Sequence, residues 1–514
     1  MLGQLIRVKI LSFVPLGVYI VRRRKMKFYL RILLLLMAAV LALSVFVGCD
    51  TGGDVGDDTD VDETNDPTSI FPDVERKDYG QDFNIFAVGE NVSWQFYITE
   101  DTNSGTPIDE AIFRRQNRVE KYLGIDIIGV KYPDSAWNTY NKNIQSAVQN
   151  MDGTLDAFIT HPHGAISNLI SDNLIIDLSE FEGIDLDAEY WNKNFMNSLE
   201  IKGNYYLGYS DYNLVDTYVI AFNKEMLAKY ASSMDKSIYD VVRDREWTLD
   251  KMIDLASNVY ADTTGNGKSK DDTFGISGNC WVGFCGFLTS SNIPMMMQDQ
   301  QSGNYKVALS DKEYQGRADG LITKLRDLDK SNFAFFDHPS TTGYSTRSVP
   351  LSSGRTLMET IGVSSLSGLL SYNVEFGVLP YPMYDLSQAN VGYKSLQWGG
   401  YIAVPSYVKN PIMTGEALEM LSFYSEPVRI TYYEKQLGKQ VADVPDDVAM
   451  LDIVWDSVST DIGQTYDDMS SGNGFCYTVP KLLDPAATQN LASFINARET
   501  LVNTAFRKFI EGLE

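Results

Sequence analysis

Aromatic and polar side chains beside the expected strands are the residues whose type and spacing favour a particular chemistry. A sugar ring presents C–H faces that stack on aromatic rings, and hydroxyl groups that bind planar polar side chains. Candidates for such contacts are Trp94, His161, Asp211, Tyr212, Asp216, Trp281, Trp398 and Tyr401. Tryptophan and tyrosine are more often buried packing residues, so core packing is the competing interpretation for each aromatic residue.

A second pattern, residues 262–268, resembles the first half of a calcium-binding loop. Oxygen ligands at positions one, three and five, glycine at six and a carbonyl at seven are typical of such loops. This interpretation assigns the ligands to Asp262, Thr264, Asn266, the carbonyl of Lys268, and Asp272. Lys270 and Thr273 stand where later positions should supply oxygen, so a plain glycine-rich turn is the alternative. No other cofactor is expected, and only three histidines are present, which argues against a zinc site.

The segment from Met26 to Cys49 predicts export. A short basic stretch is followed by an apolar run at 32–47 and then by Gly48-Cys49, the pattern of a secretory signal. Residues 46–49 resemble the lipobox of bacterial lipoproteins, with Phe46 where leucine is usual. That resemblance implies cleavage before Cys49 and a thioether-linked diacylglycerol on it. An uncut transmembrane anchor is the alternative, and Met26 is a candidate translation start.

Composition excludes some classes of function. The 514 residues are 44% hydrophobic with a formal charge of −25, which argues against a nucleic-acid partner and provides core for two or three domains. The four cysteines do not predict a disulfide framework if Cys49 carries lipid. For Cys280 and Cys285 the sequence leaves both a small disulfide loop and two thiols open.

Hydrophobic spacing predicts alternating strands and helices. Expected strands are 83–88, 125–130, 155–159, 219–222, 376–380 and 400–405. Expected helices are 107–123, 165–170, 249–259, 314–329, 414–425, 446–455 and 489–511. Thr106 before Pro107, and Gly124 after the first helix, are typical cap residues. This alternation predicts an α/β fold with mainly parallel sheets.

Between Phe83 and Leu513 the chain resembles the extracellular carbohydrate-type solute-binding proteins of ATP-driven importers, a group found in Firmicutes. The segments that carry this resemblance are 156–159, 174–178, 220–227, 247–250, 376–385 and 450–454. The resemblance implies a two-lobed periplasmic-binding-protein-like fold of type II, with ligand held in a cleft and chain crossings near 216–219 and 398–401. It implies a leader at 1–48, an acidic tether at 49–77, the first lobe at 78–217 and 398–440, the second lobe at 218–397, and bridging helices at 441–514.

The resemblance further implies a monomeric binding protein, not an enzyme, that delivers an oligosaccharide to an ABC permease. It would be held on the outer face of the cytoplasmic membrane by its lipid anchor alone. A surface glycoside hydrolase is the first alternative, because it needs only two carboxylates and the chain has 68 acidic residues. A binding protein for a peptide or another non-sugar solute, and an adhesive surface lipoprotein, are further alternatives.

Overall fold

The computed structural model describes part of the chain, and all statements below concern the residues that it describes. They are 71–86, 106–130, 137–151, 153–160, 166–213, 217–230, 234–299, 301–338, 340, 350–398, 400–436 and 445–513. The signal region, Cys49 and the acidic segment after it lie outside this set. Residues Thr64–Glu514 form one compact unit.

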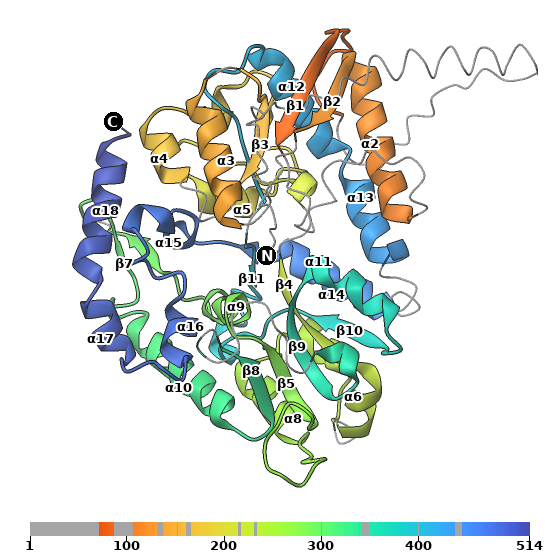
Figure 1. Cartoon of the computed structure of the whole chain (residues 1–514), viewed down its shortest axis with the longest axis vertical. Coiled ribbons are helices and arrows are strands. Elements are labelled where there is room, and N and C mark those ends of the chain that lie inside the picture. The colour runs from red at the N-terminus through yellow and green to blue at the C-terminus, as the bar shows by residue number, and fades with distance from the viewer. Residues whose placement is uncertain are drawn as a thin grey trace, which may run out of the picture. The chain divides into compact units, whose positions relative to one another are not determined.

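The first of two larger sheets has four strands. Its spatial order is β12 (Tyr401–Ala403), β3 (Ala157–Thr160), β1 (Gln81–Phe86) and β2 (Ile125–Gly129). Three of them, β1, β2 and β3, are labelled in Figure 1. Strand β1 is parallel to both β2 and β3, whereas β12 is antiparallel to β3. Strand β12 therefore joins this sheet from far along the chain.

The second sheet has five strands in the spatial order β10 (Phe376–Leu379), β4 (Tyr218–Asn223), β9 (Thr356–Gly362), β5 (Phe274–Asn279) and β8 (Ala334–Asp337). Strand β5 is parallel to β8 and β9, while β4 is antiparallel to β9 and β10. The mixed α/β class predicted from sequence is confirmed, with antiparallel pairings added at β12 and around β4.

Local sequence explains helix α2 (Pro107–Leu123) in detail. The Thr106 side chain accepts a hydrogen bond from the Asp109 amide at its N-terminus, and Pro107 occupies the first turn. Gly124 ends the helix in the left-handed conformation at φ 61°, which glycine adopts without a steric penalty. The caps predicted from sequence are confirmed at both ends.

The remaining helices occupy the connections between strands. Those before the second sheet are α3 (Trp137–Gln149), α4 (Ile166–Ser171) and α5 (Lys193–Leu199). Within the second sheet's segment they are α6 (Lys224–Tyr230), α7 (Ile238–Arg243), α8 (Leu249–Ser257), α9 (Val282–Ser290), α10 (Gln315–Lys330) and α11 (Val363–Leu366). After β12 follow α12 (Pro411–Phe423), α13 (Glu426–Ile430), the π-helical turn η6 (Thr431–Gln436) and α14 (Pro445–Asp456).

Short elements complete the described chain. The 3₁₀ turns are η1 (Leu178–Glu180), η2 (Asp211–Asn213), η3 (Leu351–Ser353), η4 (Ser367–Ser371), η5 (Leu386–Gln388) and η7 (Asp467–Ser470). Two-stranded pairs are formed by β6 (Met296–Gln298) with β7 (Tyr305–Val307), and by β11 (Ser395–Leu396) with β13 (Val458–Ser459).

The C-terminal segment contacts elements that follow strands of both sheets. Its later helices are α15 (Ile462–Thr465), α16 (Thr478–Leu483), α17 (Leu491–Asn496) and α18 (Glu499–Glu511). Turn η7 packs on α4, which follows β3, and α16 packs on α9, which follows β5.

The single helix predicted at 489–511 is wrong, because the chain breaks between α17 and α18. Arg498 leaves the helical region at φ −126°, and its guanidinium lies 3.8 Å from the centre of the Phe494 ring. None of the helices in the described part of the chain has the length and apolar character needed to cross a membrane.

Candidate functional site

Three chain segments lie side by side where the chain passes between the sheets. Thr217, just before β4, forms an antiparallel bridge with Gln397, and its Oγ1 donates a hydrogen bond to Gln397 Oε1 at 2.7 Å. The Gln397 amide donates to the carbonyl of Ser459 at 3.1 Å. The third segment is therefore supplied by the C-terminal part of the chain.

Next to these segments, three aromatic rings meet. The Trp281 ring is stacked on the Tyr477 ring, with centroids 4.1 Å apart and an interplanar angle of 22°. The Trp398 ring lies 5.5 Å from the same tyrosine at 57°. We call Trp281, Trp398 and Tyr477 the aromatic cluster. Two of its members are candidates named from sequence, and the structure brings them together.

The cluster lies near the carboxyl ends of strands from both sheets. Trp281 follows β5, which runs parallel to β8 and β9. Trp398 precedes β12, and the neighbouring Gly400 amide donates to the carbonyl of Thr160, the last residue of β3. Carboxyl ends of strands are where ligands bind in open α/β sheets. The aromatic cluster is therefore a candidate ligand site.

The three rings differ in exposure. Trp281 and Tyr477 are half-buried, whereas Trp398 is only 8% exposed. Burial raises the pKa of the Tyr477 hydroxyl well above its usual value, so the group stays neutral and retains its proton. The Lys481 ammonium lies 5.9 Å from the Tyr477 ring centre. The cluster therefore presents apolar ring surface with one neutral hydroxyl.

Asp211 and Tyr212 belong to a different group of residues, which we call the charge cluster: Arg115, Asp211, Tyr212, Arg429 and Trp455. The Arg115 guanidinium lies 4.6 Å from the centre of the Tyr212 ring, and the Arg429 guanidinium lies 5.1 Å from that of Trp455. Arg429 Nε lies 3.7 Å from Asp211 Oδ1. Burial raises the Asp211 pKa to about 7 although Arg429 lowers it. Asp211 and Tyr212 therefore each contact a cationic side chain inside the protein.

Tyr401 is fully buried. Its ring lies 5.9 Å from the Phe195 ring, and its hydroxyl is 3.4 Å from Thr460 Oγ1. This is the position of a packing residue, and a ligand contact by Tyr401 stays a prediction. The candidates Trp94, His161 and Asp216 lie outside the described residues, as does the lipidation site Cys49.

The candidate calcium loop is closed by hydrogen bonds from the backbone. The Asp262 carboxylate accepts from the amides of Gly265 and Gly267, and the Asp272 carboxylate accepts from those of Thr263 and Ser269. Thr264 Oγ1 donates to Asn266 Oδ1, and the Lys268 ammonium donates to the carbonyls of Asp329 and Ser331. Among the described residues there is no group of three acidic, histidine or cysteine side chains placed to hold a metal. Calcium binding here stays a prediction.

Tyr477 is the functional candidate that the sequence analysis missed, because residues 441–514 were interpreted as helices. It follows the glycine-containing turn Ser471-Gly472-Asn473-Gly474. An aromatic residue after a glycine-containing turn is the signal that could have identified it.

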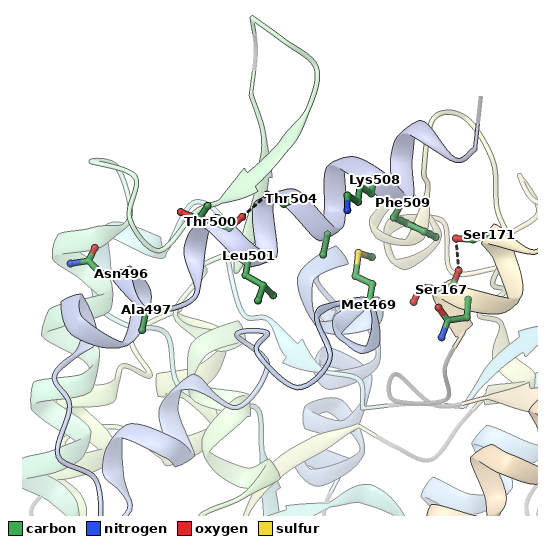
Figure 2. Close-up of a pocket in the computed structure, with 12 residues that line it drawn as sticks. Ser167, Ser171, Met469, Asn496, Ala497, Thr500, Leu501, Thr504, Lys508 and Phe509 are labelled. Atoms are coloured by element: carbon green, nitrogen blue, oxygen red, sulfur yellow. Dashed lines mark hydrogen bonds between the residues drawn. The ribbon is translucent and has the colours of Figure 1, made fainter.

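A separate cavity of about 670 Å³ lies along α18 (Figure 2). Residues of α4, η7, α17 and α18 line it, among them Ser167, Met469, Thr500, Leu501 and Lys508. Its lining includes no residue of the aromatic cluster and none of the candidates named from sequence.

Comparisons with known proteins agree with this architecture. A sequence profile described as bacterial extracellular solute-binding protein matches residues 119–453. A search of curated protein sequences finds no match.

Three similar solved structures show the two-lobed fold. The ABC substrate-binding protein Lmo0181 from Listeria monocytogenes, in complex with cycloalternan, is 13% identical with a TM-score of 0.50 and covers 84% of this chain and 98% of its own. The GacH receptor of Streptomyces glaucescens, solved without ligand and with acarbose, is 15% identical with a TM-score of 0.52, covering 84% and 100%. The maltose/maltodextrin-binding domain MalE from Bdellovibrio bacteriovorus, bound to maltotriose, is 15% identical with a TM-score of 0.53, covering 83% and 100%.

Proposed function

Because the chain belongs to the bacterial extracellular solute-binding proteins, we propose that it captures an oligosaccharide at the aromatic cluster and delivers it to an ABC importer. The observation that carries this proposal is the meeting of Trp281, Trp398 and Tyr477 beside the carboxyl ends of strands from both sheets. Aromatic ring surface stacks on the C–H face of a sugar and offers no partner for an anionic solute.

The ligands of the similar structures support a carbohydrate. Cycloalternan, acarbose and maltotriose are all oligosaccharides or close analogues of one. Each was found in a protein that shares only the fold with this chain, so the sugar itself is a matter for experiment. Both the aromatic cluster and the ligands of these three complexes favour a carbohydrate as the class of ligand.

The proposed role of each ring follows from its exposure. Trp281 is half-buried and stacks with Tyr477 through one face, so its remaining surface is the sugar platform. Trp398, being nearly buried, positions the Tyr477 ring beside Trp281. A sugar that touches residues following β5 and residues preceding β12 favours the closed state over the open state, which is the condition for closure by ligand.

The proposal includes lipid anchoring at Cys49 on the outer face of the cytoplasmic membrane, and a monomer that changes nothing in its ligand. The signal-like segment 26–49 supports the anchor. Cys49→Ala should move the protein from the detergent phase to the aqueous phase in a detergent partition. Retention of the variant in the detergent phase would contradict lipidation.

The function is tested by a thermal-shift screen of the full chain with glucose, maltotriose and longer oligosaccharides, a peptide mixture and polyamines. We expect hits confined to oligosaccharides, because a ligand that binds only the folded state raises the melting temperature by mass action. Chromatography of the sugar after incubation distinguishes the alternatives. Intact sugar agrees with a receptor, and shortened sugar would establish a glycoside hydrolase. Hits confined to peptides would overturn the carbohydrate assignment.

A further inference from the structure

Two cysteines lie next to the aromatic cluster in the chain. Cys285 lies one turn after Trp281 in α9, and Cys476 immediately precedes Tyr477. Both side chains are buried, each 1% exposed, and both residues carry thiols in this structure. The disulfide between Cys280 and Cys285 that the sequence left open is absent.

Geometry places the two cysteines close together. The Cys285 thiol lies 3.2 Å from the Cys476 carbonyl oxygen and 3.3 Å from the Trp281 carbonyl oxygen, and it donates to both. Covalent geometry keeps a sulfur about 3 Å, and a carbonyl oxygen about 2.5 Å, from its own Cα. The two Cα atoms are therefore within about 9 Å, and a disulfide requires them to be about 4.4–6.8 Å apart.

Cys280 has different surroundings. Burial raises the pKa of the Cys280 thiol, and the carboxylates of Asp329, Asp484 and Asp337 raise it further. For Cys476 burial also raises the thiol pKa, but the largest neighbouring contribution comes from the Cys285 thiol. The pair that the fold brings together is Cys285 with Cys476.

We propose that Cys285 and Cys476 form a disulfide when the chain folds outside the cell, where oxidising conditions allow such bonds to persist. The oxidant is a disulfide, either of a thiol–disulfide oxidoreductase or of oxidised glutathione. One cysteine thiolate attacks it to give a mixed disulfide and one released thiol. The second cysteine thiolate then attacks the protein sulfur of that mixed disulfide and releases the second thiol. Two electrons and two protons thus pass from the cysteines to the oxidant.

The exchange must precede complete burial, because the folded protein covers both sulfurs. Once formed, the bond closes a loop from residue 285 to residue 476 that includes β8, β9 and β10. A loop of this length is expected to raise the melting temperature by about 5 °C. The bond also fixes the chain on both sides of the Trp281–Tyr477 stack. It requires no ligand and stands independently of the proposed function.

Differential labelling tests the pair. The full chain is folded in a glutathione redox buffer, and its free thiols are then labelled with iodoacetamide in denaturant. The disulfides are next reduced, and the thiols that they release are labelled with N-ethylmaleimide. Chymotrypsin cleaves after Trp281 and Phe284, which separates Cys280 from Cys285. We expect N-ethylmaleimide on Cys285 and Cys476, iodoacetamide on Cys280, and a melting temperature about 5 °C higher than that of the chain refolded in a phosphine reductant.

Two variants serve as controls. Cys280→Ser should leave the labelling of the pair unchanged, whereas Cys476→Ser should leave Cys285 labelled by iodoacetamide. Iodoacetamide on both Cys285 and Cys476 of the wild-type chain would overturn the proposal. N-ethylmaleimide on Cys280 together with Cys285 would overturn it as well, and because this result comes from the wild-type chain it does not depend on the folding of any variant.

Discussion

The aromatic cluster and the charge cluster contain residues chosen from the sequence by the same reasoning, yet the structure uses them differently. In the aromatic cluster, Trp281 and Trp398 converge on Tyr477, and part of the ring surface remains exposed. In the charge cluster, Asp211 faces Arg429 and Tyr212 lies under Arg115, with both candidate residues buried.

This difference shows that the position of a residue in a loop does not determine whether its side chain is buried against a partner or left exposed to a ligand. Asp211 and Trp398 both precede a passage of the chain between sheets, but a carboxylate inside the protein requires a partner and receives one from α13. An aromatic ring has no such requirement and can remain partly uncovered. The charge cluster should therefore govern stability and the aromatic cluster should govern binding.

The largest effect is expected from Arg429→Ala. Asp211 would then be buried without its cation, and breaking a buried pair from one side costs about 3 kcal/mol of unfolding free energy. Urea denaturation at pH 9 measures this loss, because two pH units above the Asp211 pKa of about 7 protonation of the carboxylate no longer limits the loss to less than about 3 kcal/mol. The variant that remains folded should bind oligosaccharide as the wild type does. A stability loss below about 1 kcal/mol would remove the distinction between the clusters.

The next effect is expected from Trp281→Ala. Loss of an aromatic anchor should weaken affinity for the best oligosaccharide of the screen about 30-fold, which corresponds to about 2 kcal/mol. Isothermal titration calorimetry measures this change. Tyr372→Ala removes an exposed aromatic ring outside the cluster and is the matched control. Equal affinities of the wild type and Trp281→Ala would place the sugar elsewhere.

A smaller effect is expected in the pH dependence of stability. The folded-state pKa of Asp211, about 7, lies above the ordinary value near 4, so the folded protein binds a proton there that the unfolded chain does not. The contribution of Asp211 to stability is therefore fully present below pH 4 and is lost as the pH rises through 7. Asp211→Asn should flatten the slope between pH 5 and 7 by up to about 1 kcal/mol per pH unit. An unchanged slope in urea denaturation would contradict the buried position of this carboxyl.

The smallest effect is expected from calcium. If residues 262–272 bind the ion, millimolar Ca²⁺ should raise the melting temperature by about 2 °C and EDTA should reverse the change. Asp262→Asn should abolish this response without altering sugar binding, because the loop precedes β5 whereas Trp281 follows it, at the opposite end of the strand. A melting temperature that is the same in Ca²⁺ and EDTA would identify the loop as a plain turn.

Sequence reasoning predicted the first sheet better than the second. Strands β1 and β2 carry apolar residues at alternating positions, and α2 carries its cap residues in sequence. Strand β9 was missed because Thr356, Glu359 and Thr360 interrupt its apolar run, although every residue of the strand is buried. Glu359 is tolerated there because its carboxylate accepts a hydrogen bond from the Leu351 amide. The fold supplies that partner, and the sequence around Glu359 does not indicate it.

The same limit applies to the candidate site. Trp281 and Trp398 were predictable as aromatic residues in loops next to strands. Their meeting depends on Tyr477, which reaches them only because the C-terminal segment returns beside β11 and packs on α9. No spacing between residues 281, 398 and 477 encodes this contact, since more than a hundred residues separate the first two.

The late position of β12 and Tyr477 in the chain has a consequence for export. A polypeptide threaded through a membrane from its N-terminus delivers β1, β2 and β3 long before β12, the strand that completes their sheet. The ring of residue 477 arrives later still. Under the proposed function, the aromatic cluster is therefore complete only after Tyr477 has crossed, so sugar capture begins when export is almost finished.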